Sequence, residues 1–181
     1  ERITEYLARL WTLDSGKALI QKLQSIGLQI LYTDGNSEYS AEIQAVKINV
    51  AAPKSYWGVV LEDGVYMVVE RTEDSAALFA HELLHAWHDF ENIGPFKDVA
   101  IVDRTGALLE QEEAFTIRGK FDDEERSLYE GLILKELRLP IRLFHDESKL
   151  SDLAEDEVGN KMISEETLRN LFGADNFGRL F

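Results

Sequence analysis

The chain has 181 residues, with 34 acidic against 19 basic side chains and a formal net charge of −15. A chain of this length can bury roughly 70% of the surface of its unfolded form, so we expect one domain over residues 1–181. The acidic balance excludes a nucleic-acid backbone and an anionic membrane as partners, because like charges repel. A protein surface is the expected partner.

The sequence contains no cysteine. This excludes disulfides, thiolate metal sites and a cysteine nucleophile, so any metal must be held by His, Asp or Glu. Its apolar runs are also too short to span a bilayer, so we expect no membrane contact.

The spacing of apolar side chains predicts an α+β fold. The elements are expected in this order: helices over residues 3–10 and 14–27, strands over 28–32, 43–50, 56–61 and 65–69, and helices over 76–90, 108–118 and 123–137. The strands form one small, mostly antiparallel sheet, with a hairpin at Asp63-Gly64. Residues 146–181 form an acidic, loosely helical part on the surface, and mobility of some of it stays an open alternative.

The segment His81-Glu82-Leu83-Leu84-His85 is an HExxH motif inside the helix expected over residues 76–90. Positions i and i+4 lie about 40° apart around a helix, so both imidazoles can hold one zinc ion. Glu82 then lies beside them as a general base. The alternative, two separate core histidines, leaves three histidines on one buried helix face without partners.

A hydrolytic zinc site has three protein ligands and one open position. Without cysteine, the third ligand is a carboxylate or His145. Glu112 and Glu113 both point partly inward on the helix over residues 108–118. Glu113 is the better candidate for the ligand, and Glu112 for a carboxylate that holds a ligand histidine. His88 follows on the same helix face. As a fourth ligand it would close the site, so we expect it to pack beside the ligands instead.

Two segments resemble a known family. Asp74-Ser-Ala-Ala-Leu-Phe-Ala-His-Glu-Leu-Leu-His-Ala-Trp-His and Glu112-Glu-Ala-Phe-Thr-Ile-Arg-Gly are similar to the HELIHAxH and EExxTxGG motifs of clostridial neurotoxin light chains. With Glu136-Leu-Arg-Leu-Pro-Ile-Arg, they resemble still more closely the NleD-like zinc-protease effectors that bacteria inject into host cells. The likeness covers roughly residues 74 to 145 and leaves the N-terminal helices, the sheet and the acidic tail uncovered.

The resemblance implies a zincin-like metalloprotease with Zn²⁺ held by His81, His85 and Glu113. It also implies that Arg142 faces the reacting centre. The family usually places a tyrosine three residues after this arginine, where this chain has His145. Either His145 substitutes for it in stabilising the oxyanion, or Tyr129 reaches in, or the activity is altered. The glycine pair of the neurotoxin motif is reduced to one glycine here.

The expected function is that of a zinc-dependent endopeptidase, a monomeric secreted bacterial effector that cleaves a host protein in the host cytosol. A host kinase as substrate is implied by the resemblance alone. The alternatives are a zinc hydrolase toxin domain with another substrate and a catalytically silent zinc-binding module. The acidic surface is either an ordinary solvated face or a rim that attracts a basic stretch of substrate.

Overall fold

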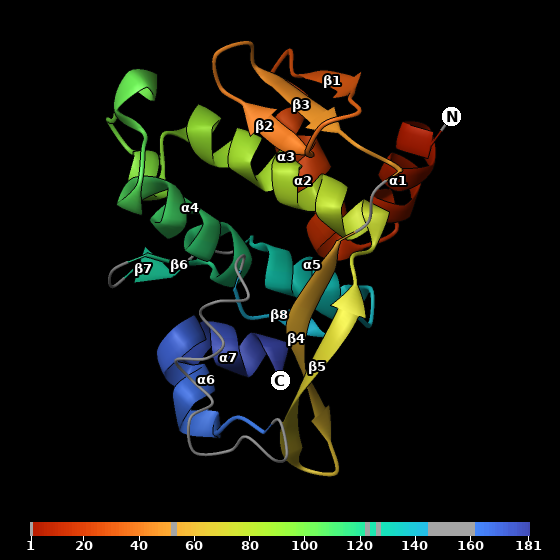
Figure 1. Cartoon of the computed structure of the whole chain (residues 1–181), viewed down its shortest axis with the longest axis vertical. Helices are drawn as coiled ribbons and strands as arrows, with labels where there is room; N and C mark the ends of the chain where they lie inside the picture. The colour runs from red at the N-terminus through yellow and green to blue at the C-terminus, as the bar shows by residue number, and fades with distance from the viewer. Residues whose placement is uncertain (1, 52–53, 122–123, 126–127, 145–161) are drawn as a thin grey trace.

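The computed structural model describes residues 2–51, 54–121, 124–125, 128–144 and 162–181. The predicted α+β class is confirmed (Figure 1). The helices are α1 (Arg2–Trp11), α2 (Asp14–Leu23), α3 (Ser75–Glu91), α4 (Ala107–Arg118), α5 (Glu130–Glu136), α6 (Glu165–Phe172) and α7 (Ala174–Leu180), with the 3-10 turns η1 (Gly94–Phe96) and η2 (Ile101–Asp103). None of the described helices combines the length and apolar character needed to cross a bilayer.

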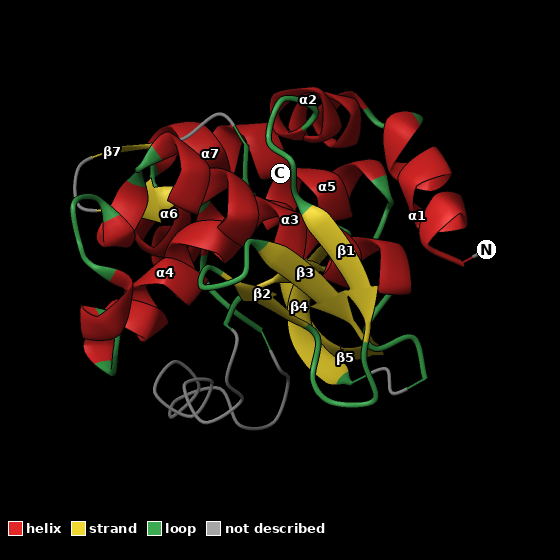
Figure 2. Cartoon of the chain, turned by 90° about the horizontal axis from the view of Figure 1, so that it is seen from above, coloured by secondary structure: helices red, strands yellow, loops and turns green. Residues whose placement is uncertain are grey.

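The strands form several small sheets, so the prediction of one sheet is wrong (Figure 2). They are β1 (Gln29–Tyr32), β2 (Glu38–Ser40) and β3 (Ala45–Ile48) in the order β1-β3-β2; β4 (Ser55–Glu62), β5 (Val65–Thr72) and β8 (Ile141–Arg142) in the order β5-β4-β8; and the pair β6 (Lys120–Phe121) and β7 (Glu124–Glu125). The pairing is antiparallel except between β1 and β3. Strand β2 has three residues, too few to show an alternating pattern.

The β4–β5 hairpin forms as predicted. Asp63 and Gly64 both have positive φ, 50° and 80°, and Glu62 pairs with Val65 across the turn. A type I′ turn requires positive φ at both central positions, and Asp-Gly meets that need at little steric cost. The hairpin thereby fixes the register of the two longest strands of the protein's described part.

Helix α3 lies at the centre of the fold, between the β1-β3-β2 sheet on one side and α5 on the other (Figure 1). Its N-cap is Asp74, whose carboxylate accepts from the amides of Ala76 and Ala77 at 3.0 and 3.2 Å. It ends at Asn92, which adopts the left-handed conformation with φ 51°. Phe79 and Leu83 of α3 pack in the core formed with α1, α2 and β3.

The C-terminal helices are part of a second core, so their predicted surface position is wrong. Leu168 and Phe172 are fully buried, and Phe177 and Leu180 nearly so. They pack against the β4–β5 hairpin and α5. The helical prediction for the described residues 162–181 holds, but apolar residues from both sides of the break at Gly173 pack in one core, which the pairs seen in sequence did not reveal. Residues 146–161 lie outside the described part.

The helix expected over residues 123–137 is shorter than predicted. Residues 124–125 are paired with β6, and α5 begins at Glu130. The start is set by tertiary packing: the ring of Tyr129 fills the space beside Gly119, where a Cβ would lie 2.4 Å from the ring. Gly119 ends α4 with φ 69°, so the end of α4 and the start of α5 are fixed together.

A substitution at a core position of α6 tests whether this helix packs in the core or lies on the surface as a tail. Phe172→Ala removes a fully buried ring that contacts Phe181 edge-on, so we expect it to lower the free energy of unfolding by about 3–5 kcal/mol. Chemical denaturation measures this. The exposed neighbour Asn170→Ala is the matched control and should change the free energy by less than about 0.5 kcal/mol. Equal effects of the two substitutions would contradict the packing described.

Candidate metal centre

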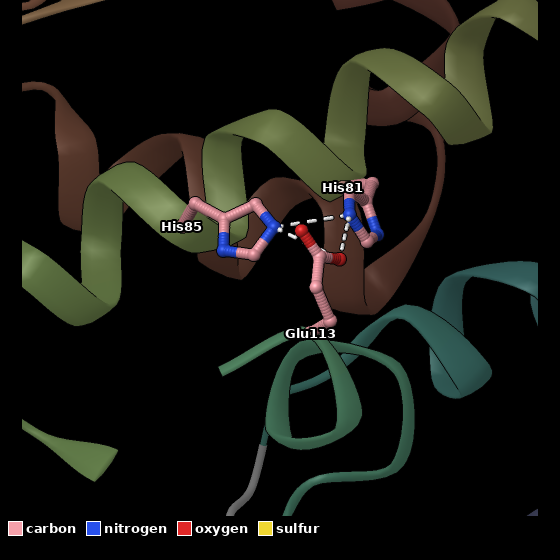
Figure 3. A group of neighbouring side chains, drawn as sticks. All are labelled: His81, His85 and Glu113. Carbon is pink, nitrogen blue, oxygen red and sulfur yellow. Dashed lines mark hydrogen bonds and ion pairs between the residues drawn. The ribbon is translucent and has the colours of Figure 1, made fainter. Parts of the chain in front are cut away.

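The structure brings three of the predicted ligand side chains together. His81 and His85 lie on successive turns of α3, and Glu113 of α4 points between them (Figure 3). Glu113 Oε2 lies 3.1 Å from His81 Nε2 and 3.5 Å from His85 Nε2, and the two Nε2 atoms are 3.0 Å apart. Donor atoms of a tetrahedral zinc site lie roughly 3.4 Å apart, given bonds of about 2.0–2.1 Å. The group therefore fits a metal ion.

The far side of each imidazole is held by a buried carboxylate. His81 Nδ1 lies 2.9 Å from Glu130 Oε2, and His85 Nδ1 lies 3.1 Å from Glu112 Oε1. A carboxylate at Nδ1 accepts a hydrogen bond from the ring N–H and so favours the tautomer in which Nε2 carries the lone pair. Two such lone pairs 3.0 Å apart repel each other unless a metal ion lies between them or an imidazole takes up a proton. This is the strongest observation in favour of a metal.

Glu112 makes the contact predicted for it and also binds His88. Its Oε1 atom lies 2.8 Å from His88 Nδ1, and Thr116 Oγ1 donates to the same oxygen at 3.2 Å. His88 is fully buried, and its ring packs against Phe115 at 4.6 Å between centroids. His88 thus packs beside the candidate ligand group, which in the described part of the chain consists of His81, His85 and Glu113.

Glu130 is a site residue that sequence analysis missed. Its carboxylate joins His81 to Arg142, whose Nη1 lies 3.4 Å from Glu130 Oε1. Arg142 also pairs with Glu73, and all three side chains are nearly inaccessible to solvent. The available signal was a glutamate directly before the apolar run Gly-Leu-Ile-Leu, at a place that was expected to be mid-helix.

Burial and neighbouring charges shift the pKa values of His81, Glu112 and Glu113 in opposite directions. Burial lowers the pKa of His81, but Glu130 and Glu113 outweigh it and raise that pKa to about 9. Burial likewise opposes the charge of Glu112, yet His85 and His88 bring its pKa down to about 2. The pKa of Glu113 is also lowered, by the two ligand histidines acting against burial. Without a metal, the site is therefore held together by protonated imidazoles between carboxylates.

Glu82 lies in the wall of a groove beside the ligand group. Its side chain is buried, which raises its pKa against the opposing effect of His81 and His85, and the amide of Tyr39 in β2 bonds to it. A cavity of about 410 Å³ runs along β2 and is lined by Glu82, His85 and Glu113. β2 is an edge strand. The general-base candidate thus borders the ligands and an edge that can pair with an extended chain.

The opposite wall of this groove is apolar and fixed in place. It is formed by Phe96, Ile101 and Leu109, of which Ile101 is 50% and Leu109 48% exposed. Arg104 anchors it, since Nη1 contacts Asp89 Oδ1 at 2.5 Å while the guanidinium lies over the ring of Phe96. Asp89 also accepts from the Tyr39 hydroxyl at 2.8 Å, so one carboxylate ties both walls together.

The remaining predicted site residues have different outcomes. Arg142 lines a smaller cavity of about 150 Å³ together with His81 and Glu82, but its described side-chain contacts are ion pairs with Glu73 and Glu130 and a stacking contact with the Tyr56 ring at 5.0 Å. Its contact with a reacting carbonyl stays a prediction. Tyr129 does not reach the centre, because it is fully buried and its hydroxyl donates to the carbonyl of Asn176 at 3.4 Å. His145 lies outside the described residues.

Comparison of the chain with protein-family models, with curated proteins and with solved structures finds no match. The assignment of the site therefore depends on its own geometry and on the motifs quoted above.

Removal of the carboxylate ligand tests the centre directly. Glu113→Gln keeps the shape of the side chain but replaces an anionic donor, so we expect zinc affinity to fall about 100-fold or more. Competition against a chromogenic chelator measures the affinity. Glu110→Gln, on the exposed face of the same helix, loses the same charge and should bind zinc as the wild type does. Equal affinity of the two variants would exclude Glu113 as a ligand.

Proposed function

We propose that this chain is a zinc-dependent endopeptidase of a zincin-like type. The observation that carries the proposal is the position of Glu82, which borders both the ligand group and the groove along the edge strand β2. Metalloproteases commonly bind a substrate by adding its extended chain to such an edge. Glu82 lines both this groove and the smaller cavity, so the two adjoin at the general-base candidate.

The residues have distinct proposed roles. When bound by His81, His85 and Glu113, zinc supplies a Lewis acid that polarises the scissile carbonyl and acidifies water. Glu82 accepts a proton from the attacking water and returns it to the leaving amine. Glu112 and Glu130 hold the two imidazoles with Nε2 turned inward.

Arg142 forms ion pairs with Glu130 and Glu73 and lines the cavity beside Glu82. We propose that it also stabilises the oxyanion of the tetrahedral intermediate, because a cation in a desolvated wall acts strongly on developing charge. The family resemblance supports this role for the arginine. It does not extend to His145.

We further propose that the protein is an NleD-like effector, secreted by a bacterium, that cleaves a protein in the host cytosol. The support is the combination of His81-Glu82-Leu-Leu-His85-Ala with Glu112-Glu113 and Arg142 in matching order and spacing. A host kinase is the substrate class that this resemblance suggests.

Substitution of the general base tests the activity. Glu82→Gln should retain zinc and abolish cleavage, because the amide cannot accept the proton. Wild type and variant are incubated with a host-cell lysate, and new protein N-termini are mapped across the proteome. Glu91→Gln, at the exposed end of the same helix, is the matched control and should cleave as the wild type does.

The outcomes separate the candidate functions. New N-termini that need Glu82 support the endopeptidase. A zinc-loaded wild type that produces none excludes it and leaves a hydrolase of another substrate or a silent zinc-binding module. Cleavage by Glu82→Gln at the wild-type rate would remove Glu82 from the mechanism.

A further inference from the structure

Two cavities meet beside Glu82, and Lys54 lines both. The smaller, of about 150 Å³, includes Arg142 and His81 in its wall, and the larger, of about 410 Å³, includes His85. Asn36 and Ser37 also border both cavities. A chain that occupies both cavities therefore has Lys54 within its reach.

The carboxylates that line the two cavities already have cationic or imidazole partners, apart from the general base Glu82. Their shortest pairings are Glu38 with Lys47, Glu73 with Arg142, Glu112 with His88 and Glu113 with His81. The lining arginines are paired as well, Arg104 with Asp89 and Arg142 with Glu73 and Glu130. In the described part of the chain, Lys54 has no such ion pair.

The position of Lys54 is set by its backbone. Its carbonyl accepts from the amide of Glu73 at 2.7 Å, directly before β4 begins at Ser55. The facing turn is also fixed, because the side-chain amide of Asn49 donates to the carbonyls of Asp34 and Gly35 at 3.2 and 2.6 Å. Asn36, on that turn, has no side-chain hydrogen bond to the described residues. Both residues are exposed, so in the described part of the chain an ammonium and an amide that no protein group binds border the two cavities.

We propose that Lys54, with Asn36, binds an acidic side chain of the substrate close to the scissile bond. This rests on the proposed peptidase function and names its substrate class. A carboxylate is the partner that an unpaired ammonium and an amide donor both satisfy, and a charged hydrogen bond of this kind is among the stronger ones. The attraction in this contact opposes the long-range repulsion that the protein's net charge of −15 exerts on acidic substrates.

The salt dependence of cleavage distinguishes this proposal from the alternative that the acidic surface attracts a basic stretch of substrate. Long-range repulsion is screened over about 8 Å at physiological ionic strength, whereas a contact pair is screened less. Lys54 is exposed, so its contact weakens with salt as well, and the sign of the preference is the test: it should stay acidic as ionic strength rises. An acidic rim that attracts basic substrates predicts a preference for basic peptides that fades as ionic strength rises.

The test uses peptides with acetylated and amidated ends, so that no terminal carboxylate contributes. Six positions are randomised, and Asp or Glu is compared with Asn or Gln at each. We expect the wild type to cleave the acidic pool about tenfold faster at one position near the cut, mainly through a lower KM. Lys54→Glu should lose this preference and favour Lys or Arg there, while Lys97→Glu, which changes the charge equally, should keep it.

Binding without cleavage distinguishes failure of this inference from failure of the proposed function. In a Glu82→Gln background, the best acidic peptide should bind more tightly than its amide counterpart, and Lys54→Glu should reverse the order. Cleavage by the wild type with no acidic preference, and equal binding of the two peptides, would overturn the role of Lys54 and leave the peptidase intact. Acidic binding with no cleavage by the wild type would retain Lys54 and overturn the peptidase.

Discussion

The site depends on two buried carboxylates that contact the imidazoles of His81 and His85 on the side that faces away from the centre. Glu112 and Glu130 each take the Nδ1 side of one ligand histidine, at 3.1 and 2.9 Å. Their contacts determine which nitrogen faces the centre and keep the two Nε2 atoms 3.0 Å apart. A histidine pair on a helix could turn in several directions. It is the placement of α4 and α5 around α3 that turns both rings inward.

The fold supplies this placement through fixed helix ends. Helix α3 begins after its N-cap Asp74, and α4 ends at Gly119, where the ring of Tyr129 leaves no room for a side chain. Tyr129 in turn precedes Glu130, the first residue of α5. The end of α4 thus sets the position of the carboxylate behind His81. The C-terminal helices pack against this junction, since the Tyr129 hydroxyl donates to the Asn176 carbonyl.

Sequence periodicity could predict features that depend on local helical spacing. It could not predict features that depend on contacts between segments distant in sequence. The histidine pair, its helix and the inward side of Glu112 and Glu113 follow from helical spacing alone. Glu130 could not be found in that way, because its burial depends on where α5 begins, and a longer helix was expected there. The parallel pairing of β1 with β3 and the packing of α6 and α7 likewise depend on contacts between distant segments. No periodic signal records such contacts.

The charges of the site explain why it is built for a cation. Four carboxylates, those of Glu73, Glu112, Glu113 and Glu130, lie at the site with one guanidinium, that of Arg142, which pairs with Glu73 and Glu130; all but Glu113, whose side chain is 30% exposed, are nearly closed to solvent. Three negative charges then remain to be balanced, and buried charge without a partner is costly. In the absence of metal the imidazoles supply positive charge, which is why the pKa of His81 rises to about 9 although burial alone would lower it. A divalent ion supplies the same charge without the protons, so metal binding at neutral pH must release them.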